Sequence, residues 1–160
     1  MTGFQVTGRR GPSRLTHVMR RYVQLRFQAD GSQIRQVLRR AVGSFSPDLT
    51  QDDAGTLELV LAEVLNNIVE HAYAGRSPGP VVLSLRRLDG GLTCQVEDQG
   101  LPMPGLRLPE GKMQPVADEL RDLAEGGWGW ALIRALTADL RYDRRQDVNH
   151  LSFRVPLASK

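Results

Sequence analysis

Cysteine is almost absent from this sequence, since Cys94 is the only one among 160 residues. A single cysteine excludes an internal disulfide framework and favours a reducing compartment. No apolar run approaches the roughly 20 residues that are needed to span a bilayer. The basic residues 1–14 have no apolar segment behind them, so they do not resemble a secretory signal. We therefore expect a cytoplasmic protein without a membrane segment.

Repeats and low-complexity tracts are also absent, and the composition is that of a globular protein, with 41% hydrophobic and 24% charged residues. A chain of this length can bury a core without disulfides, so we expect one domain over residues 21–160. We expect residues 1–20 to be a basic, flexible segment, because five arginines fall within residues 9–21. Such a cluster can contact nucleic acid, but no binding motif accompanies it, and a solvated tail is the prediction.

Two familiar phosphate-binding motifs are missing. No G-x-x-x-x-G-K-[ST] loop occurs, and Gly127-x-Gly129 has Leu132 where a dinucleotide-binding fingerprint needs its third glycine. The segment EGGWGWALIRAL, residues 125–136, nevertheless leads from glycines directly into a predicted helix. Free N–H groups and the helix dipole favour anions there. The segment predicts either an anion site or a flexible joint before a core helix.

The hydrophobic pattern predicts a layered α+β domain in the order β-α-α-β-β-loop-α-β-β. The expected strands are residues 22–27, 81–88, 92–97, 140–144 and 151–156, and the expected helices are residues 30–42, 50–73, 116–125 and 128–138. Asp89-Gly90-Gly91 indicates a hairpin turn. The proline-rich segment from Gln99 to Pro115 predicts a long loop of the kind that binds ligands or covers a site.

The second predicted helix carries a polar cluster in residues 61–73, LAEVLNNIVEHAY. Glu63, Asn67 and His71 are spaced i, i+4 and i+8, which on a continuous α-helix places a carboxylate, an amide and an imidazole in one row. Asparagine is unfavourable within a helix, and carboxylate and amide oxygens suit Mg²⁺. The same pattern is typical of a solvated helix face, so on its own it leaves both interpretations open.

A third polar feature is the segment VEDQGLPMPG, residues 96–105. A strand that ends at Asp98 and is followed by Gly100 places a carboxylate at the edge of the sheet. A carboxylate can accept a hydrogen bond from an exocyclic amine such as that of adenine. A simple Asp-x-Gly turn is the alternative interpretation.

In their order along the chain, these motifs resemble those of the GHKL (Bergerat-fold) ATPases. The motifs are E-x-x-x-N-x-x-x-H-A in a helix, D-x-G-x-P after a strand, a proline-rich loop, and G-G-x-G at the start of a helix. Within that superfamily the chain is most similar to the anti-sigma-factor serine/threonine kinases, over about residues 22–157. The resemblance implies a two-layer α/β sandwich of the Bergerat type, with a mixed, mostly antiparallel sheet, helices on one face and an ATP lid.

The resemblance also implies roles for single residues. Asn67 would coordinate Mg²⁺ against the phosphates of ATP, and Glu63 would be the catalytic general base towards the attacking hydroxyl. Asp98 would hold the adenine amino group, and Gly100 would let the base approach. Asn149 lies where relatives often have asparagine, and it receives no role.

The remaining nucleotide-binding residues implied by the resemblance are Gly127 and Gly129, whose backbone would wrap the phosphates. Residues 103–126 would form the lid. Trp130 departs from the family pattern, which usually has an aliphatic residue there, and Trp128 precedes it. The two indoles would either crowd the phosphate turn or pack against the lid.

The function implied by the resemblance is that of an ATP- and Mg²⁺-binding protein serine kinase and anti-sigma factor that acts by partner switching. Its expected partners are a STAS-domain anti-sigma-factor antagonist, which it would phosphorylate, and a sigma factor, and related proteins are commonly homodimers. The alternative is a non-catalytic nucleotide-binding or regulator-sequestering module of the same fold. A detached histidine-kinase-type ATPase domain fits the pattern of Glu63 and His71 less well.

Overall fold

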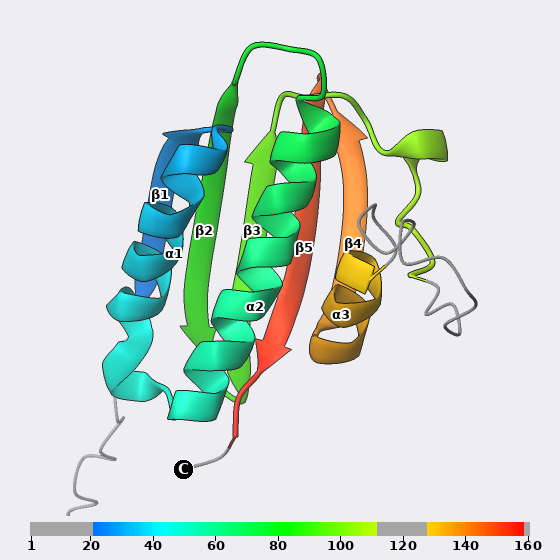
Figure 1. Ribbon diagram of the computed structural model, residues 1–160. Coiled ribbons are helices and arrows are strands. Elements are labelled where there is room, and N and C mark those ends of the chain that lie inside the picture. Colours follow the sequence, from blue (N-terminus) through cyan, green and yellow to red (C-terminus); the bar gives the residue numbers. More distant parts are fainter. Residues whose placement is uncertain (1–20, 112–127, 159–160) are drawn as a thin grey trace, which may run out of the picture.

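The computed structural model describes residues 21–111 and 128–158, and these form two layers (Figure 1). One layer is an antiparallel sheet with the strand order β1-β2-β3-β5-β4. Its strands are β1 (Tyr22–Gln28), β2 (Pro80–Leu88), β3 (Gly91–Asp98), β4 (Ala138–Arg145) and β5 (Val148–Pro156). The predicted α+β class is confirmed, and every strand pairing within the described residues is antiparallel rather than mixed.

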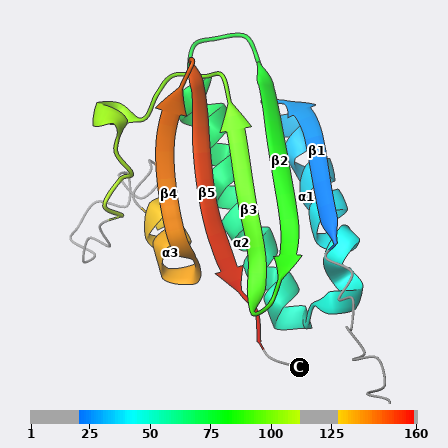
Figure 2. The same ribbon diagram turned by 180° about the vertical axis from the view of Figure 1, so that it is seen from behind.

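The second layer consists of helices that all cover the same face of the sheet (Figure 1). They are α1 (Gly31–Phe45), α2 (Gln51–Asn67) and α3 (Trp128–Leu136), and short helical turns lie at η1 (Ser46–Asp48) and η3 (Pro104–Leu106). Seen from behind, the opposite face of the sheet carries no described helix (Figure 2). The predicted helix over residues 116–125 lies outside the described residues. No helix within the described ranges is long and apolar enough to cross a bilayer.

The sequence explains how the first helices begin and which faces they bury. The Asp30 carboxylate caps α1 by accepting a hydrogen bond from the Ser32 N–H at 3.0 Å, and Thr50 caps α2 by accepting one from the Asp53 N–H at 3.1 Å. Such caps satisfy N–H groups that have no partner within the helix. Helix α1 continues three residues past the predicted end at Val42, because Phe45 is completely buried in the core.

The centre of the sheet supplies the other half of the core. Strand β3 buries Leu92, Cys94 and Val96 under the helices, and the pairing of Val96 with Leu151 continues this apolar layer into β5. The predicted β2–β3 hairpin is confirmed, and Gly90 takes a φ of 77° in its turn. Alternate residues of a strand point to opposite faces, which is why the period-2 pattern predicted these strands.

The predicted helix over residues 50–73 was wrong in one respect. Helix α2 ends at Asn67, and the chain continues through a π-helical turn, η2 (Ile68–Ala72). A π turn contains more residues than an α turn, so the predicted row of three polar side chains does not extend to His71. The His71 side chain is exposed. π turns often occur at functional sites.

Candidate functional site

The predicted site residues lie on three different elements at one end of the molecule. Glu63 and Asn67 belong to the last turns of α2, Asp98 ends β3, and Gly129 is the second residue of α3. Gly127 lies outside the described residues. The structure therefore places residues from three separate motifs of the sequence around the carboxyl end of α2, where the loop after β3 also passes (Figure 1).

The start of α3 lies directly on the polar side chains of α2. A Cβ atom added to Gly129 would lie 2.6 Å from Glu63 Oε2 and 3.9 Å from Asn67 Nδ2. A side chain at this position would therefore force the Glu63 carboxylate, the end of a flexible side chain, to move aside. The structure thus brings together the acidic residue, the amide and the second of the two predicted phosphate-binding glycines. We refer to Glu63, Asn67 and Gly129 as the phosphate end of the site.

Asn67 is the member of the phosphate end with the clearest spare hydrogen-bonding capacity. Its Nδ2 atom is buried and has no hydrogen-bond partner among the described residues. A buried polar group without a partner is costly, and such a group in a native site points to a ligand. Because the amide can rotate to present its oxygen, this position can also offer an oxygen ligand.

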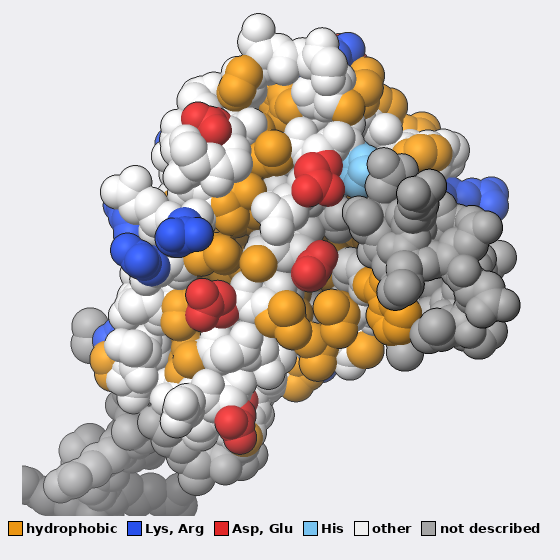
Figure 3. Space-filling model, in the orientation of Figure 1, with side chains coloured by type: hydrophobic (Ala, Val, Ile, Leu, Met, Phe, Trp, Pro, Cys, Tyr) orange, Lys and Arg blue, Asp and Glu red, His pale blue; other side chains and the backbone are white. Residues whose placement is uncertain are grey.

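The donor set of the phosphate end fits Mg²⁺. That ion takes one or two protein oxygen ligands and completes its shell with water and phosphate oxygens. The described residues contain no group of three His, Cys, Asp or Glu side chains that would form an all-protein metal site. On the helix-covered surface, acidic side chains lie along α2 and at the start of α1, and a group of basic side chains lies over the middle of α1 (Figure 3). Phosphates beside the acidic side chains of α2 would need a cation, and Asn67 is a residue that could hold one.

Asp98 marks the other end of the site and is buried, with 6% of its surface exposed. Its Oδ1 atom accepts hydrogen bonds from the Gly100 N–H at 2.9 Å and from Asn149 Nδ2 at 2.8 Å. Burial raises the pKa of the Asp98 carboxyl, although these two hydrogen bonds and the charge of Arg144 act in the opposite direction. Both hydrogen bonds end on Oδ1, so Oδ2 remains without a donor among the described residues.

No role was predicted for Asn149 from the sequence, yet its side chain is hydrogen-bonded to Asp98. It is the second residue of β5, it is 4% exposed, and it pairs with Asp98 across the β3–β5 ladder. Its Nδ2 atom donates to Asp98 Oδ1 and, at 2.9 Å, to the Leu101 carbonyl oxygen. A signal was present in the sequence, because Asn149 shares the period-2 phase of the buried residues Leu151, Phe153 and Val155. We refer to Asp98, Asn149 and the loop of residues 99–103 as the adenine end.

Gly100 is needed at the adenine end for a reason that the sequence did not show. A Cβ atom at this position would collide with the Ala72 carbonyl group. The same carbonyl oxygen accepts a hydrogen bond from the Leu101 N–H at 2.6 Å. The loop is held further by the Tyr73 hydroxyl, which accepts from the Gln99 N–H at 3.0 Å and donates to the Pro80 carbonyl oxygen at 2.9 Å. The end of the Asn67 helix and the loop after Asp98 are therefore one connected unit.

Only residues 103–111 of the predicted lid are described. They return to α3, where the Arg134 Nε–H donates to the Pro109 carbonyl oxygen at 2.8 Å and Gly111, with a φ of 67°, approaches the Ala131 backbone. The two tryptophans at the start of α3 have different environments, because Trp130 is buried and Trp128 is 41% exposed. Trp130 therefore belongs to the core.

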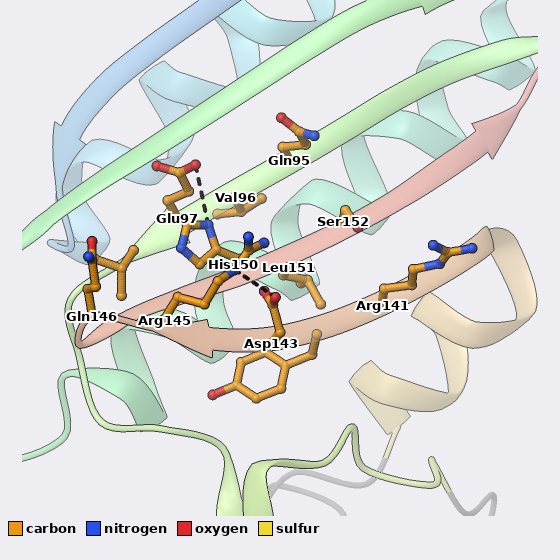
Figure 4. A pocket seen from close by; sticks show the side chains of 12 residues that line it. Gln95, Val96, Glu97, Arg141, Asp143, Arg145, Gln146, His150, Leu151 and Ser152 are labelled. Atoms are coloured by element: carbon orange, nitrogen blue, oxygen red, sulfur yellow. Dashed lines mark ion pairs between the residues drawn. The ribbon is translucent and has the colours of Figure 1, made fainter.

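A separate hollow of about 1030 Å³ lies on the opposite face of the sheet, where β3, β4 and β5 contribute its lining (Figure 4). Ion pairs join Glu97 to His150 at 3.4 Å and Asp143 to Arg145 at 2.8 Å. None of the predicted site residues lines it. This hollow is therefore separate from the candidate site, which lies where the polar groups of α2, α3 and the end of β3 converge.

A family model described as "Histidine kinase-like ATPase domain" matches residues 27–155. This chain belongs to that family. The family implies ATP binding, and the predicted membership in the GHKL superfamily is confirmed.

Proteins with related sequences come from several bacteria. Over 97 residues the chain is 34% identical to "Serine/threonine-protein kinase BtrW" of Bordetella bronchiseptica, a match that covers 61% of this chain and 66% of that protein. Over 128 residues it is 27% identical to "Anti-sigma F factor" of Priestia megaterium, which covers 78% of this chain and 84% of that protein.

A solved structure confirms the fold. The crystal structure of the RsbU and RsbW domains of Rv1364c from Mycobacterium tuberculosis matches with a TM-score of 0.59 and 18% sequence identity. The match covers 88% of this chain and 33% of that one, so this chain corresponds to about a third of the longer protein.

Proposed function

We propose that this protein is an ATP- and Mg²⁺-dependent protein serine/threonine kinase and anti-sigma factor that acts by partner switching. Its substrate would be a serine of a STAS-domain antagonist, and a sigma factor would be its second partner. The observation that carries the proposal is the contact between the start of α3 and the Glu63–Asn67 pair. The names of the relatives from Bordetella and Priestia support the two halves of the activity.

At the adenine end, the free Oδ2 atom of Asp98 would accept a hydrogen bond from the adenine amino group. The loop of residues 99–103 is already fixed against η2 and would form one wall for the base. At the phosphate end, N–H groups at the start of α3 would face the phosphate oxygens, because a helix N-terminus favours negative charge. Gly129, together with Gly127 outside the described residues, would let the backbone approach.

Phosphoryl transfer depends mainly on positioning and on neutralising charge. Asn67 would hold Mg²⁺, which when bound would supply positive charge to neutralise the phosphates. Glu63 would orient the serine hydroxyl of the antagonist and take its proton. In the described residues the Glu63 carboxylate has no hydrogen-bond or ion-pair partner, so it is available for this role.

The decisive experiment measures phosphoserine formation with labelled ATP and a cognate STAS protein. Glu63→Gln should reduce phosphotransfer by about 10²-fold or more, because a general base contributes roughly that much, while ATP affinity changes little. Glu70→Gln is the matched control, since Glu70 is exposed on η2 and should leave the rate unchanged.

Two outcomes would contradict parts of the proposal. If Glu63→Gln phosphorylated the antagonist at the wild-type rate, Glu63 would not be the base. If the wild-type protein bound a sigma factor and ATP but left no phosphoserine on the antagonist, the protein would be a regulator-sequestering module of the same fold. The two tryptophans that flank Gly129 motivate that second function, because Trp130 departs from the family pattern and the Trp128 indole is 41% exposed at the start of α3.

A further inference from the structure

Two side chains of β4 reach the adenine end from the edge of the sheet. Tyr142 and Arg144 are two residues apart and therefore point to the same face of the strand. The Tyr142 hydroxyl donates to Asn149 Oδ1 at 2.7 Å and accepts from the Met103 N–H at 3.0 Å. Arg144 Nη1 donates to Asn149 Oδ1 at 2.8 Å and to the Gly100 carbonyl oxygen at 2.9 Å. We refer to Tyr142 and Arg144 as the β4 clamp.

The β4 clamp fixes which way the Asn149 amide points. The Asn149 oxygen accepts two hydrogen bonds from the clamp, and its nitrogen donates two, to Asp98 Oδ1 and to the Leu101 carbonyl oxygen. The amide is therefore fully satisfied in this orientation. If it were reversed, its oxygen would face the Asp98 carboxylate, which only accepts hydrogen bonds when it is ionised.

The orientation of the Asn149 amide determines how Asp98 is presented. With the Gly100 N–H and Asn149 Nδ2 both bonded to Oδ1, the carboxylate cannot rotate without losing two hydrogen bonds. Its Oδ2 atom then stays directed away from them. The clamp also holds both ends of the adjoining loop, at Gly100 and Met103. These contacts converge on the two parts of the adenine end that a base would touch.

We propose that Arg144, supported by Tyr142, is a positioning residue that makes the site selective for the 6-amino group of adenine. This inference rests on the proposed nucleotide site and names what sets its specificity. Arg144 does not touch the base but acts through Asn149 and Asp98. Its side chain is 18% exposed, and its other contact, with Asp147 at 3.5 Å, reaches an almost fully exposed carboxylate. The hydrogen bonds of Arg144 to Asn149 and to the Gly100 carbonyl oxygen are therefore the contacts that fix the position of its side chain.

The test compares the binding of ATP with that of purine riboside triphosphate, which carries hydrogen in place of the 6-amino group. Isothermal titration calorimetry with Mg²⁺ should show that the wild-type protein prefers ATP by about tenfold or more, the value of one hydrogen bond to a charged group. Arg144→Met should remove most of this preference, by weakening ATP binding while leaving the analogue almost unaffected. A merely structural role would weaken both nucleotides equally.

The matched control is Arg145→Met. Arg145 is the next residue of β4, points to the opposite face of the sheet, is 72% exposed and pairs with Asp143 (Figure 4). Its substitution should leave the preference for ATP unchanged. Arg144→Lys keeps a charged donor and should retain more of the preference than Arg144→Met. Tyr142→Phe removes one hydroxyl and should cause a smaller loss.

The possible results separate this inference from the proposed function. If the wild-type protein bound neither nucleotide, the proposed function would be wrong, and this inference with it. If the wild-type protein preferred ATP and Arg144→Met kept that preference, only the role of Arg144 would be wrong. Should Arg144→Met fail to fold, Arg144→Lys and Tyr142→Phe decide, because an unchanged preference in both would overturn the inference.

Discussion

The two ends of the site differ in how completely their polar groups are satisfied. At the adenine end, Asn149 uses its whole hydrogen-bonding capacity, and Asp98 receives two hydrogen bonds on one oxygen. At the phosphate end, Asn67 Nδ2 is buried without a partner, and Glu63 has none either, among the described residues. Among the described residues, the adenine end therefore leaves one acceptor, Asp98 Oδ2, without a donor, whereas at the phosphate end both polar side chains lack a hydrogen-bond partner.

This difference indicates a division of labour within the site. A preorganised network needs no ordering when the ligand arrives, and this favours specificity. An unsatisfied group has the opposite effect, because it costs stability until a ligand meets it. We infer that the adenine end recognises the base, whereas the phosphate end is completed by the nucleotide and its metal ion. Substitutions that separate stability from activity test this comparison.

The largest effect on stability is expected for Gly100→Ala. The new Cβ would collide with the Ala72 carbonyl group, which is backbone and is held by the Leu101 N–H. Overpacking against a fixed group costs about 1–3 kcal/mol, so the midpoint of urea unfolding should fall. Gly43→Ala is the control, because nothing lies within 4 Å of its Cβ and the position is helical. If both variants were equally stable, the adenine end would not be rigid.

The next effect in size is expected for Gly129→Ala, and it has the opposite sign for stability. The new Cβ would meet Glu63 Oε2, the end of a flexible side chain that can move aside. Alanine in place of glycine stabilises a helix by up to about 1 kcal/mol. The midpoint of urea unfolding should therefore stay the same or rise slightly. Phosphotransfer should fall by about tenfold or more, because the displaced carboxylate no longer reaches the substrate hydroxyl. A variant with normal activity would show that this contact is not part of the site.

The contrast between these two glycines also shows what the sequence could predict. Period-2 and helical patterns predicted the strands and the three described helices, because burial repeats with the geometry of each element. The motif order predicted Glu63, Asn67 and Asp98 as neighbours of one ligand, and the structure places them on adjoining elements. A glycine in a motif, however, does not reveal which atom its missing side chain would strike. That depends on the approach of segments far apart in the chain.

The π turn and the role of Asn149 were missed for a similar physical reason. Local propensity predicts a helix from Thr50 to Tyr73. The π turn occurs where Ala72 and Tyr73 make tertiary contacts with the loop after β3, and local propensity takes no account of such contacts. Asn149 carries a signal of burial in its phase, but its partner follows from the β3–β5 register. Register between strands that are about 50 residues apart cannot be read from either strand alone.

The smallest effect on stability is expected for Asp98→Asn, with a clear dependence on pH. Burial raises the folded-state pKa of Asp98, so wild-type stability falls as the pH rises from the ordinary aspartate value of about 3.9 through this raised pKa. Asparagine keeps one oxygen for the Gly100 and Asn149 donors and carries no charge. The variant should therefore be at least as stable as the wild-type protein at pH 7, and this difference should shrink towards pH 3.

Calorimetry completes this test at pH 7, because Asp98→Asn replaces the free acceptor oxygen by a donor. Affinity for ATP should fall by about 10- to 100-fold, the value of a hydrogen bond to a charged group, although stability does not fall. Thermal unfolding of both proteins at pH 3 and at pH 7 measures the predicted difference in stability. A variant that was much less stable at pH 7 would mean that the Asp98 charge stabilises the fold, and the adenine end would then be a structural ion site rather than a recognition site.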